Sequence, residues 1–299
     1  MQENNNKYVS SRGLMKSCNF ISSTPISSIR KLINYPDIKL IELLDNPIIY
    51  ICSSAIPDFI NNYFQKIDKQ FIIVSGDCDE SIPNDIFRTE QEYLNFIEND
   101  KIIHWFCQNF TEKHKKITNI PIGLDYHTMT KKTIWGNITS CNEQEKLLEL
   151  IKNKGNPYSS RKLMCYANFH FTMTTKYSYD RKNAILNVPK KLVHYEIQKI
   201  NRLQTWNNQK DYAFVISPHG GGYDCHRTWE ALILGCIPIV KTSKIDILYK
   251  DLPVLIVNNW SDINETLLAE TVYNFSKINF KTEKLLLNYW NNEIRRHFV

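Results

Sequence analysis

The sequence lacks the patterns that mark several large classes of protein. No segment reaches eighteen uncharged apolar residues, and the polar first residues lack the apolar core of a signal peptide. We therefore expect a cytoplasmic protein with no transmembrane segment. The cysteines include no C-x-x-C pair and no Cys/His spacing of the zinc-site type, so we expect buried free thiols. They lie at positions 18, 52, 78, 107, 141, 165, 225 and 236.

The net charge of the chain is also small. The 37 Lys and Arg residues exceed the 31 Asp and Glu residues by a net +6. This excess suits anionic ligands but falls short of the composition typical of nucleic-acid-binding proteins. With 299 residues, 42% hydrophobic and 12% aromatic, the chain can form one large globular domain or two of ordinary size.

Most of the signals that point to chemistry fall between residues 212 and 240. The apolar run 213–216 predicts a buried strand, residues 225–234 a helix ended by Gly235, and residues 236–240 the next strand. Between the first strand and the helix lies a loop with three consecutive glycines, and we expect Asp224 to be the helix N-cap. A strand, a glycine-rich turn and a helix N-terminus together suit a phosphate. The predicted phosphate-site residues here are Ser217, His219, Gly220, Gly221, Gly222 and Asp224.

The predicted helix carries cations where they are normally disfavoured. His226 and Arg227 occupy its first turn, where cations oppose the helix dipole. A nearby anion would remove that penalty. Glu230 lies three and four residues further on, close to the same face. We predict that Arg227 pairs with a diphosphate and that Glu230 accepts hydrogen bonds from hydroxyl groups such as those of a ribose. The alternative is a glycine-rich loop before a solvated helix start.

The first half of the chain alternates predicted strands and helices. Strands are expected at 48–51, 71–74 and 102–106, with helices at 57–67 and 89–98, and a short strand at 7–11 followed by a loop at 12–16. Polar residues follow two of the predicted strand ends, where open α/β sheets bind ligands. Each is a candidate proton acceptor, with a structural hydrogen bond as the alternative role. They are Asp77, Asp79, Asp125 and His127.

The second half repeats this alternation. The pattern loosens between residues 130 and 160, and we place the domain junction there, giving domains at 1–140 and 141–299. A strand at 163–167 ends at Asn168, a helix starts near Arg181, and a strand at 252–257 precedes a closing helix at 284–298. Asp77 and Asp79 form a three-residue Asp-x-Asp match, which is too short a motif to predict a metal site. The sequence predicts an α/β protein of two Rossmann-like domains that face each other across a cleft.

One segment carries a family resemblance. The run HRTWEALILGCIPIV, followed by Leu-Pro-Val at 252–254 and Asn-Trp-Ser-Asp at 259–262, resembles the exostosin-like glycosyltransferases of family 47 over residues 211–262. The resemblance implies a GT-B fold and transfer of a sugar from a nucleotide diphosphate sugar, linked to UDP, GDP or dTDP, to a hydroxyl of a glycan or other saccharide. It implies no tightly bound cofactor or metal. It also implies that Arg227 holds the diphosphate and Glu230 the ribose or sugar, and similarity to related GT-B enzymes adds Asn168 and Arg181 to the phosphate contacts.

The expected chemistry follows from the charge on the leaving group. Breaking the bond to the anomeric carbon leaves a diphosphate whose added negative charge must be stabilised, for which we expect Arg227, His226 and the helix N-terminus. If configuration inverts, as we expect, one of the four candidates in the first domain deprotonates the acceptor. If configuration is retained, no base is needed and these residues bind the acceptor instead. The alternative function is a non-catalytic nucleotide- or carbohydrate-binding protein.

Overall fold

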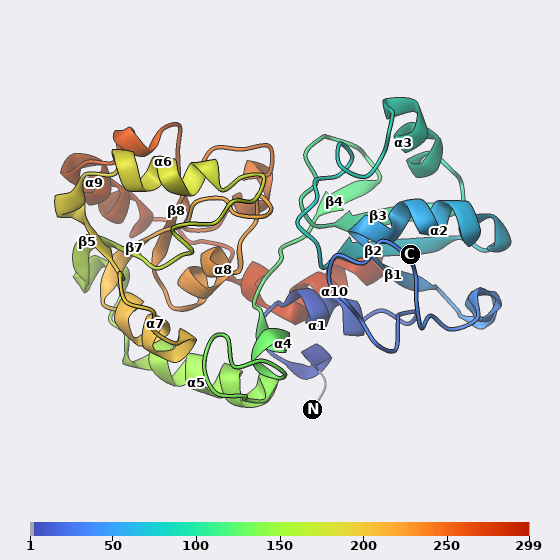
Figure 1. Cartoon of the computed structure of the whole chain (residues 1–299), viewed down its shortest axis with the longest axis horizontal. Coiled ribbons are helices and arrows are strands. Elements are labelled where there is room, and N and C mark those ends of the chain that lie inside the picture. Colours follow the sequence, from blue (N-terminus) through green and yellow to red (C-terminus); the bar gives the residue numbers. More distant parts are fainter. Residues whose placement is uncertain (1–2, 299) are drawn as a thin grey trace.

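Two parallel β-sheets lie side by side in the computed structural model, which describes residues 3–298 (Figure 1). The first sheet has the order β1-β2-β3-β4, and the second has the order β6-β5-β7-β8-β9. The α/β class and the two parallel sheets are therefore as predicted. The first sheet contains β1 (Ile48–Cys52), β2 (Phe71–Gly76), β3 (Ile102–Cys107) and β4 (Ile117–Asn119). The second contains β5 (Lys162–Ala167), β6 (Val193–Tyr195), β7 (Tyr212–Ile216), β8 (Ile237–Lys241) and β9 (Leu255–Val257).

Both faces of the first sheet are buried. Successive side chains along each strand point to opposite faces, and the side chains on both faces are mostly apolar. Ile49 and Ile73 point to the face covered by α2 (Ile56–Asn62) and α3 (Glu90–Ile97). Their neighbours Tyr50 and Val74 point to the opposite face, where α1 (Ser11–Lys16) and α10 (Leu287–Arg295) pack. The two faces therefore belong to two separate hydrophobic clusters.

The second sheet is also covered on both faces. Phe214 and Ile216 of β7 pack in a cluster with residues of α6 (Tyr179–Asn187) and α9 (Glu265–Phe275). Val215, between them, belongs to the cluster that includes residues of α5 (Cys141–Lys154), α7 (Arg202–Gln209) and α8 (His226–Ile233). Because β6 lies on one side of β5 and β7 on the other, the carboxyl ends of β5 and β7 form the switch point at which open α/β sheets bind ligands.

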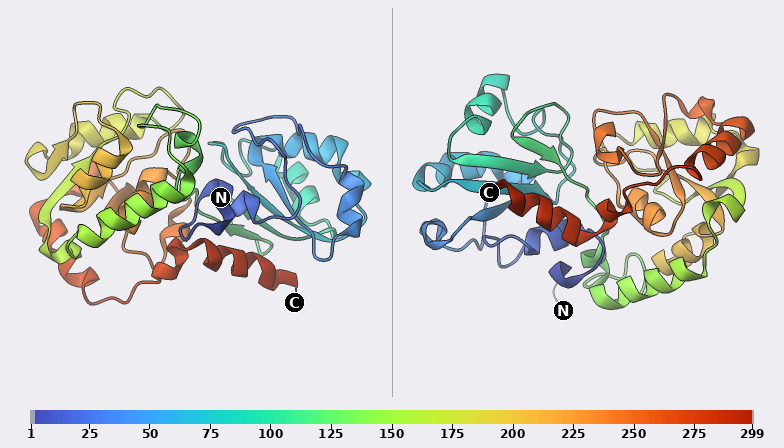
Figure 2. Two further views of the ribbon diagram at one scale, coloured as in Figure 1. Left: turned by 90° about the horizontal axis from the view of Figure 1, so that it is seen from below. Right: turned by 180° about the vertical axis from the view of Figure 1, so that it is seen from behind.

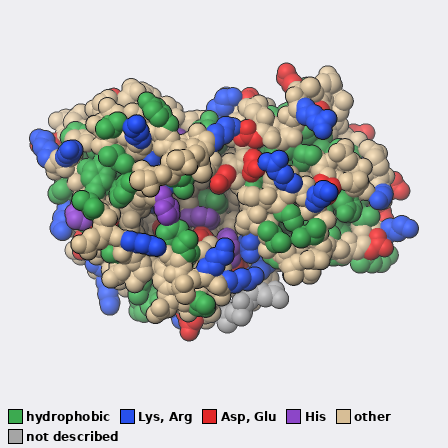
Figure 3. Space-filling view, in the orientation of Figure 1, with side chains coloured by type: hydrophobic (Ala, Val, Ile, Leu, Met, Phe, Trp, Pro, Cys, Tyr) green, Lys and Arg blue, Asp and Glu red, His purple; other side chains and the backbone are tan. Residues whose placement is uncertain are grey.

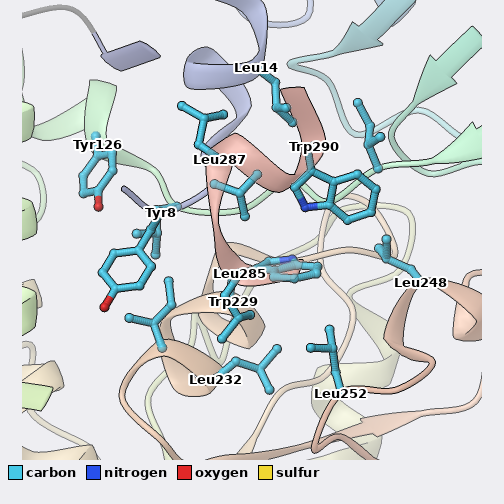
Figure 4. Packing of buried hydrophobic residues seen from close by; sticks show 14 of the residues in the cluster. Tyr8, Leu14, Tyr126, Trp229, Leu232, Leu248, Leu252, Leu285, Leu287 and Trp290 are labelled. Atoms are coloured by element: carbon cyan, nitrogen blue, oxygen red, sulfur yellow. The ribbon is translucent and has the colours of Figure 1, made fainter. Parts of the chain in front are cut away.

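Both ends of the chain tie the two halves together. The backbone of Val9 donates to Leu285 and accepts from Leu124, so residues 8–10 lie between a segment near the C-terminus and the end of the first sheet. Helix α10 then runs back from the second half to the first (Figure 2). Its Trp290 shares one hydrophobic cluster with Leu14 of α1 and Trp229 of α8 (Figure 4). The two halves thus share a buried core.

The N-terminal prediction was wrong in detail. Residues 7–11 form no strand, only isolated bridges at Tyr8 and Ser10, and the predicted loop at 12–16 is helix α1. This helix begins because the Ser10 hydroxyl caps it, accepting from the Gly13 N–H at 3.0 Å. The helix predicted at 57–67 is split into α2 and a 3-10 turn (Phe64–Lys66), and α4 (Tyr126–Met129) follows β4. No helix within residues 3–298 combines the length and apolar character needed to span a membrane.

Candidate functional site

The carboxyl ends of the two sheets face each other across a hollow between the halves. Figure 3 shows His side chains lining this hollow, with acidic and basic side chains around its rim. Asp79, just after β2, lies against the backbone of Gly221, just after β7. One predicted site residue of each domain therefore lies beside the other.

Two arginines of the second domain flank one aromatic ring near the switch point. The guanidinium carbons of Arg227 and Arg181 lie 5.3 and 5.9 Å from the centre of the Phe169 ring, which follows β5. Burial and the neighbouring Arg227 lower the pKa of Arg181 to about 10. Among the described residues, no carboxylate lies within 4.0 Å of either guanidinium. The two arginines therefore form a group with an excess of positive charge that an anion would neutralise.

Backbone carbonyls hold the two arginines in place. Arg181 donates from Nε to the His219 carbonyl at 3.1 Å and from Nη1 to the His170 carbonyl at 3.2 Å. Arg227 donates from Nη2 to the Pro218 carbonyl at 2.7 Å. Its Nε is buried and has no hydrogen-bond partner among residues 3–298. A buried donor without a partner is costly unless a ligand accepts from it.

Two of the three glycines lie against the first domain, and Gly220 lies against Arg181 of the second. A Cβ on Gly221 would overlap the Asp79 carboxylate, and one on Gly222 would lie 2.9 Å from both the Asp79 carbonyl and Asn109 Nδ2. The Gly220 carbonyl accepts from the Thr175 hydroxyl at 2.9 Å and from the Tyr177 N–H at 3.2 Å. The loop therefore packs against the first domain and against the segment after β5, and its contact with a phosphate stays a prediction.

Asp224 was predicted to be the N-cap of α8, but the N-cap residue of this helix is Cys225. The Asp224 carboxylate is buried and accepts from the Ile122 N–H at 2.8 Å, the Trp229 Nε1–H at 2.9 Å and the Cys225 N–H at 2.9 Å. Burial raises the pKa of Asp224 to about 6, although these hydrogen bonds lower it. Its side chain thus joins the two domains from inside the protein. Ser217 is likewise buried, with its hydroxyl 2.8 Å from that of Thr228.

His226 contacts the first domain. Its Nδ1 lies 2.7 Å from the carbonyl oxygen of Gly123, which comes between β4 and α4. The imidazole is half-buried. The residue predicted to stabilise a leaving phosphate is therefore oriented by the opposite half of the molecule.

Glu230 belongs to an ion-pair network that the sequence did not predict. Arg202, the first residue of α7, places Nε 3.6 Å from Glu230 Oε1 and Nη2 3.1 Å from Asp125 Oδ2. The Glu230 oxygens accept no hydrogen bond within residues 3–298 and are not shut off from solvent. They can therefore accept from a ligand hydroxyl. The capping pattern of Asn201 and Gln204 is the sequence signal that would have located this helix.

Three of the four candidate proton acceptors are engaged within the protein. Asp77 pairs with Arg12 at 3.3 Å. Burial would raise the pKa of Asp125, but His226, His127 and Arg202 hold it well below its usual value. Burial keeps the pKa of His127 low, at about 3, and its Nδ1 lies 3.2 Å from Asp125 Oδ1.

Asp79 is the exception among the four, because its side chain is exposed. Desolvation and the adjacent Glu80 still raise the pKa of Asp79, while His226 and Arg181 lower it.

The two remaining predicted residues lie on the second domain. Asn168 donates to the Thr205 hydroxyl at 2.7 Å, and the His219 N–H donates to Asp180 Oδ2 at 2.9 Å.

Comparisons with known proteins add little to this geometry. No protein-family model matches the sequence, and no curated protein matches it. One solved structure, that of TarM, is similar over 87% of this chain and 53% of its own, with 13% identity and a TM-score of 0.34. The chain thus spans about half the length of that protein. A likeness at this level carries no conclusion about function, and the exostosin-like assignment stays a prediction.

Proposed function

We propose that the chain is a glycosyltransferase of the GT-B type, which moves a sugar from a nucleotide diphosphate sugar to a hydroxyl of a saccharide acceptor. The observation that carries the proposal is the pair Arg181 and Arg227, which has no carboxylate within 4.0 Å among the described residues and lies at the switch point of a doubly wound sheet. Two guanidinium groups fixed by backbone carbonyls suit a diphosphate, whose charge grows as the sugar leaves.

The other site residues have complementary roles in this proposal. Glu230 accepts from hydroxyl groups of the ribose or the sugar, because its oxygens are free of protein hydrogen bonds within residues 3–298. Asp79 lies on the first domain beside Gly221, so it faces the donor from the acceptor side. UDP-, GDP- and dTDP-linked sugars all carry the diphosphate on which the proposal depends.

Isothermal titration calorimetry with UDP, GDP and dTDP tests the donor site. We expect one of the three to bind the wild type, and Arg227→Ala and Arg181→Ala each to weaken binding about 10- to 150-fold, since a hydrogen bond to a charged group contributes about 1.5–3 kcal/mol. Arg296→Ala, at an exposed arginine paired with Glu293 at 2.7 Å, is the matched control and should leave affinity unchanged. The absence of binding by the wild type to all three nucleotides would refute the proposal.

A second candidate function is nucleotide or carbohydrate binding without catalysis. The engagement of Asp77, Asp125 and His127 inside the protein favours it, because these groups are poorly placed to accept a proton. Donor hydrolysis separates the two functions. A transferase slowly transfers the sugar to water, whereas a binding protein leaves the donor intact.

A further inference from the structure

We propose that His226 of the second domain, through Nε2, accepts the proton of the acceptor hydroxyl. The inference rests on the proposed function and places the proton acceptor on the second domain, because three of the four first-domain candidates are engaged within the protein. It assigns to His226 a role different from contact with the leaving phosphate.

The contact with Gly123 fixes which imidazole nitrogen is basic. A backbone carbonyl can only accept, so the 2.7 Å contact requires that Nδ1 carries a proton and donates it to the Gly123 oxygen. In the neutral ring, Nε2 then has the free lone pair. This nitrogen makes no hydrogen bond within residues 3–298 and is not among the buried unpaired atoms of that region, so it is open to solvent.

The orienting carbonyl is itself held rigidly. Gly123 has a φ of 61°, and a Cβ there would overlap the backbone of Val9. Ser10 forms a bridge with Gly123, and the next N–H, that of Leu124, donates to the Val9 carbonyl at 2.9 Å. The ring of His226 is therefore oriented by a carbonyl that cannot easily turn away. This is the arrangement of a base positioned by a third group.

Charged and titratable groups from both domains lie near His226. The groups that face it are Asp77 and Asp79 after β2, Asp125 and His127 at α4, Asp224 before α8, and Arg227 and Glu230 on α8 itself. Burial raises the pKa of Asp77, Asp79 and Asp224, and the nearby His226 counteracts part of that rise. His226 also helps to hold the pKa of Asp125 below its usual value. Among the described residues no carboxylate lies within 4.0 Å of the His226 ring nitrogens, so no direct ion pair blocks Nε2.

The transfer step balances with the groups present. The acceptor oxygen forms a bond to the anomeric carbon as its proton passes to Nε2 of His226. The bond between the anomeric carbon and the phosphate oxygen breaks, and its electron pair leaves with the diphosphate. The added negative charge falls beside Arg181 and Arg227, and the imidazolium later returns its proton to water.

Hydrolysis of four defined donors, with water as acceptor, tests the inference. The probes are UDP-glucose, UDP-N-acetylglucosamine, GDP-mannose and dTDP-glucose, followed by release of the nucleotide. In His226→Asn the amide nitrogen replaces Nδ1 and still donates to Gly123, but no base remains. We expect its kcat to fall at least about 100-fold, a usual contribution of a general base. Nucleotide affinity should stay within about twofold, since the arginines are intact.

The pH profile adds a readout that a structural role would not change. The wild-type kcat should fall at acid pH as Nε2 becomes protonated, and the residual rate of His226→Asn should lack this acid limb. Asp79→Asn tests the competing first-domain candidate and should keep this limb. The inference is overturned if His226→Asn turns over within threefold of the wild type, if Asp79→Asn loses the limb instead, or if the wild type binds a nucleotide but hydrolyses none of the donors. Failure of the wild type to bind any nucleotide would instead refute the proposed function.

Discussion

Replacement of Arg202 by methionine is the sharpest test of how the site is held together. Arg202 is 11% exposed in its side chain and lies between Asp125 and Glu230, which are 9% and 10% exposed. Methionine keeps most of the apolar stem but leaves two buried carboxylates without their shared cation. Breaking a buried pair from one side costs about 3–5 kcal/mol. We expect a loss of about 3 kcal/mol in unfolding free energy, at the low end of that range, because Asp125 keeps the Thr128 N–H.

The loss should depend on pH in a defined direction. The folded-state pKa of Asp125 is depressed, so its stabilisation is present above the unfolded value near ~4 and is lost as pH falls through the folded value. Without Arg202 the folded pKa rises, and the stabilisation is lost at higher pH. The difference in unfolding free energy between wild type and Arg202→Met should therefore be fully present at pH 7 and should shrink as pH falls through the raised folded pKa of Asp125 in the variant.

Urea unfolding at a series of pH values from 7 downwards, followed by tryptophan fluorescence, measures this difference. Lys244→Met is the control, because Lys244 and Glu112 form a 2.8 Å pair whose side chains are 55% and 44% exposed. Such a pair contributes at most about 1 kcal/mol. If Arg202→Met costs no more than the control at pH 7, or if its cost grows as the pH is lowered, the reasoning about this network is wrong.

Two further predictions concern the joint between the domains. Trp229→Phe removes the donor to both Asp224 oxygens, at 2.9 and 3.0 Å, and should cost about 1.5–3 kcal/mol in urea unfolding at pH 7; a cost below about 0.5 kcal/mol would contradict it. Gly222→Ala places a Cβ 2.9 Å from the Asp79 carbonyl, so it should lower the melting temperature and speed proteolysis of the loop. Gly155→Ala, whose Cβ would lie at least 3.2 Å from its neighbours, is the control and should do neither.

The sequence was informative where the determinants are local. The strand β7, the helix α8 and the strand β8 followed from an apolar run, an amphipathic segment and Gly235, whose φ is 74°. Each of these signals acts within about ten residues of its own position. Helix α1 was missed because it is six residues long and depends on the single cap at Ser10.

The contacts that the site residues make could not be predicted from local sequence patterns. Asp125 and Arg202 are 77 residues apart in the sequence, and no pattern around either residue indicates that they pair. The three glycines suggested a phosphate loop, but their close contacts are with Asp79 and Asn109 of the other domain and with Arg181. Composition could not distinguish these uses, since a close backbone approach requires glycine whether the neighbour is a ligand or a second domain.

The shared core explains how a site divided between two domains can keep one geometry. Surface pairs such as Lys176 with Asp85, at 2.6 Å, cross the cleft but are exposed and contribute little. Trp229 of α8 and Trp290 of α10 are instead buried in one cluster with Leu14 (Figure 4). Trp229 also donates to Asp224, whose carboxylate accepts from the Ile122 N–H beside Gly123. The His226 to Gly123 contact is therefore set by buried packing on either side of it, so the orientation of Nε2 should persist when the exposed pairs are removed.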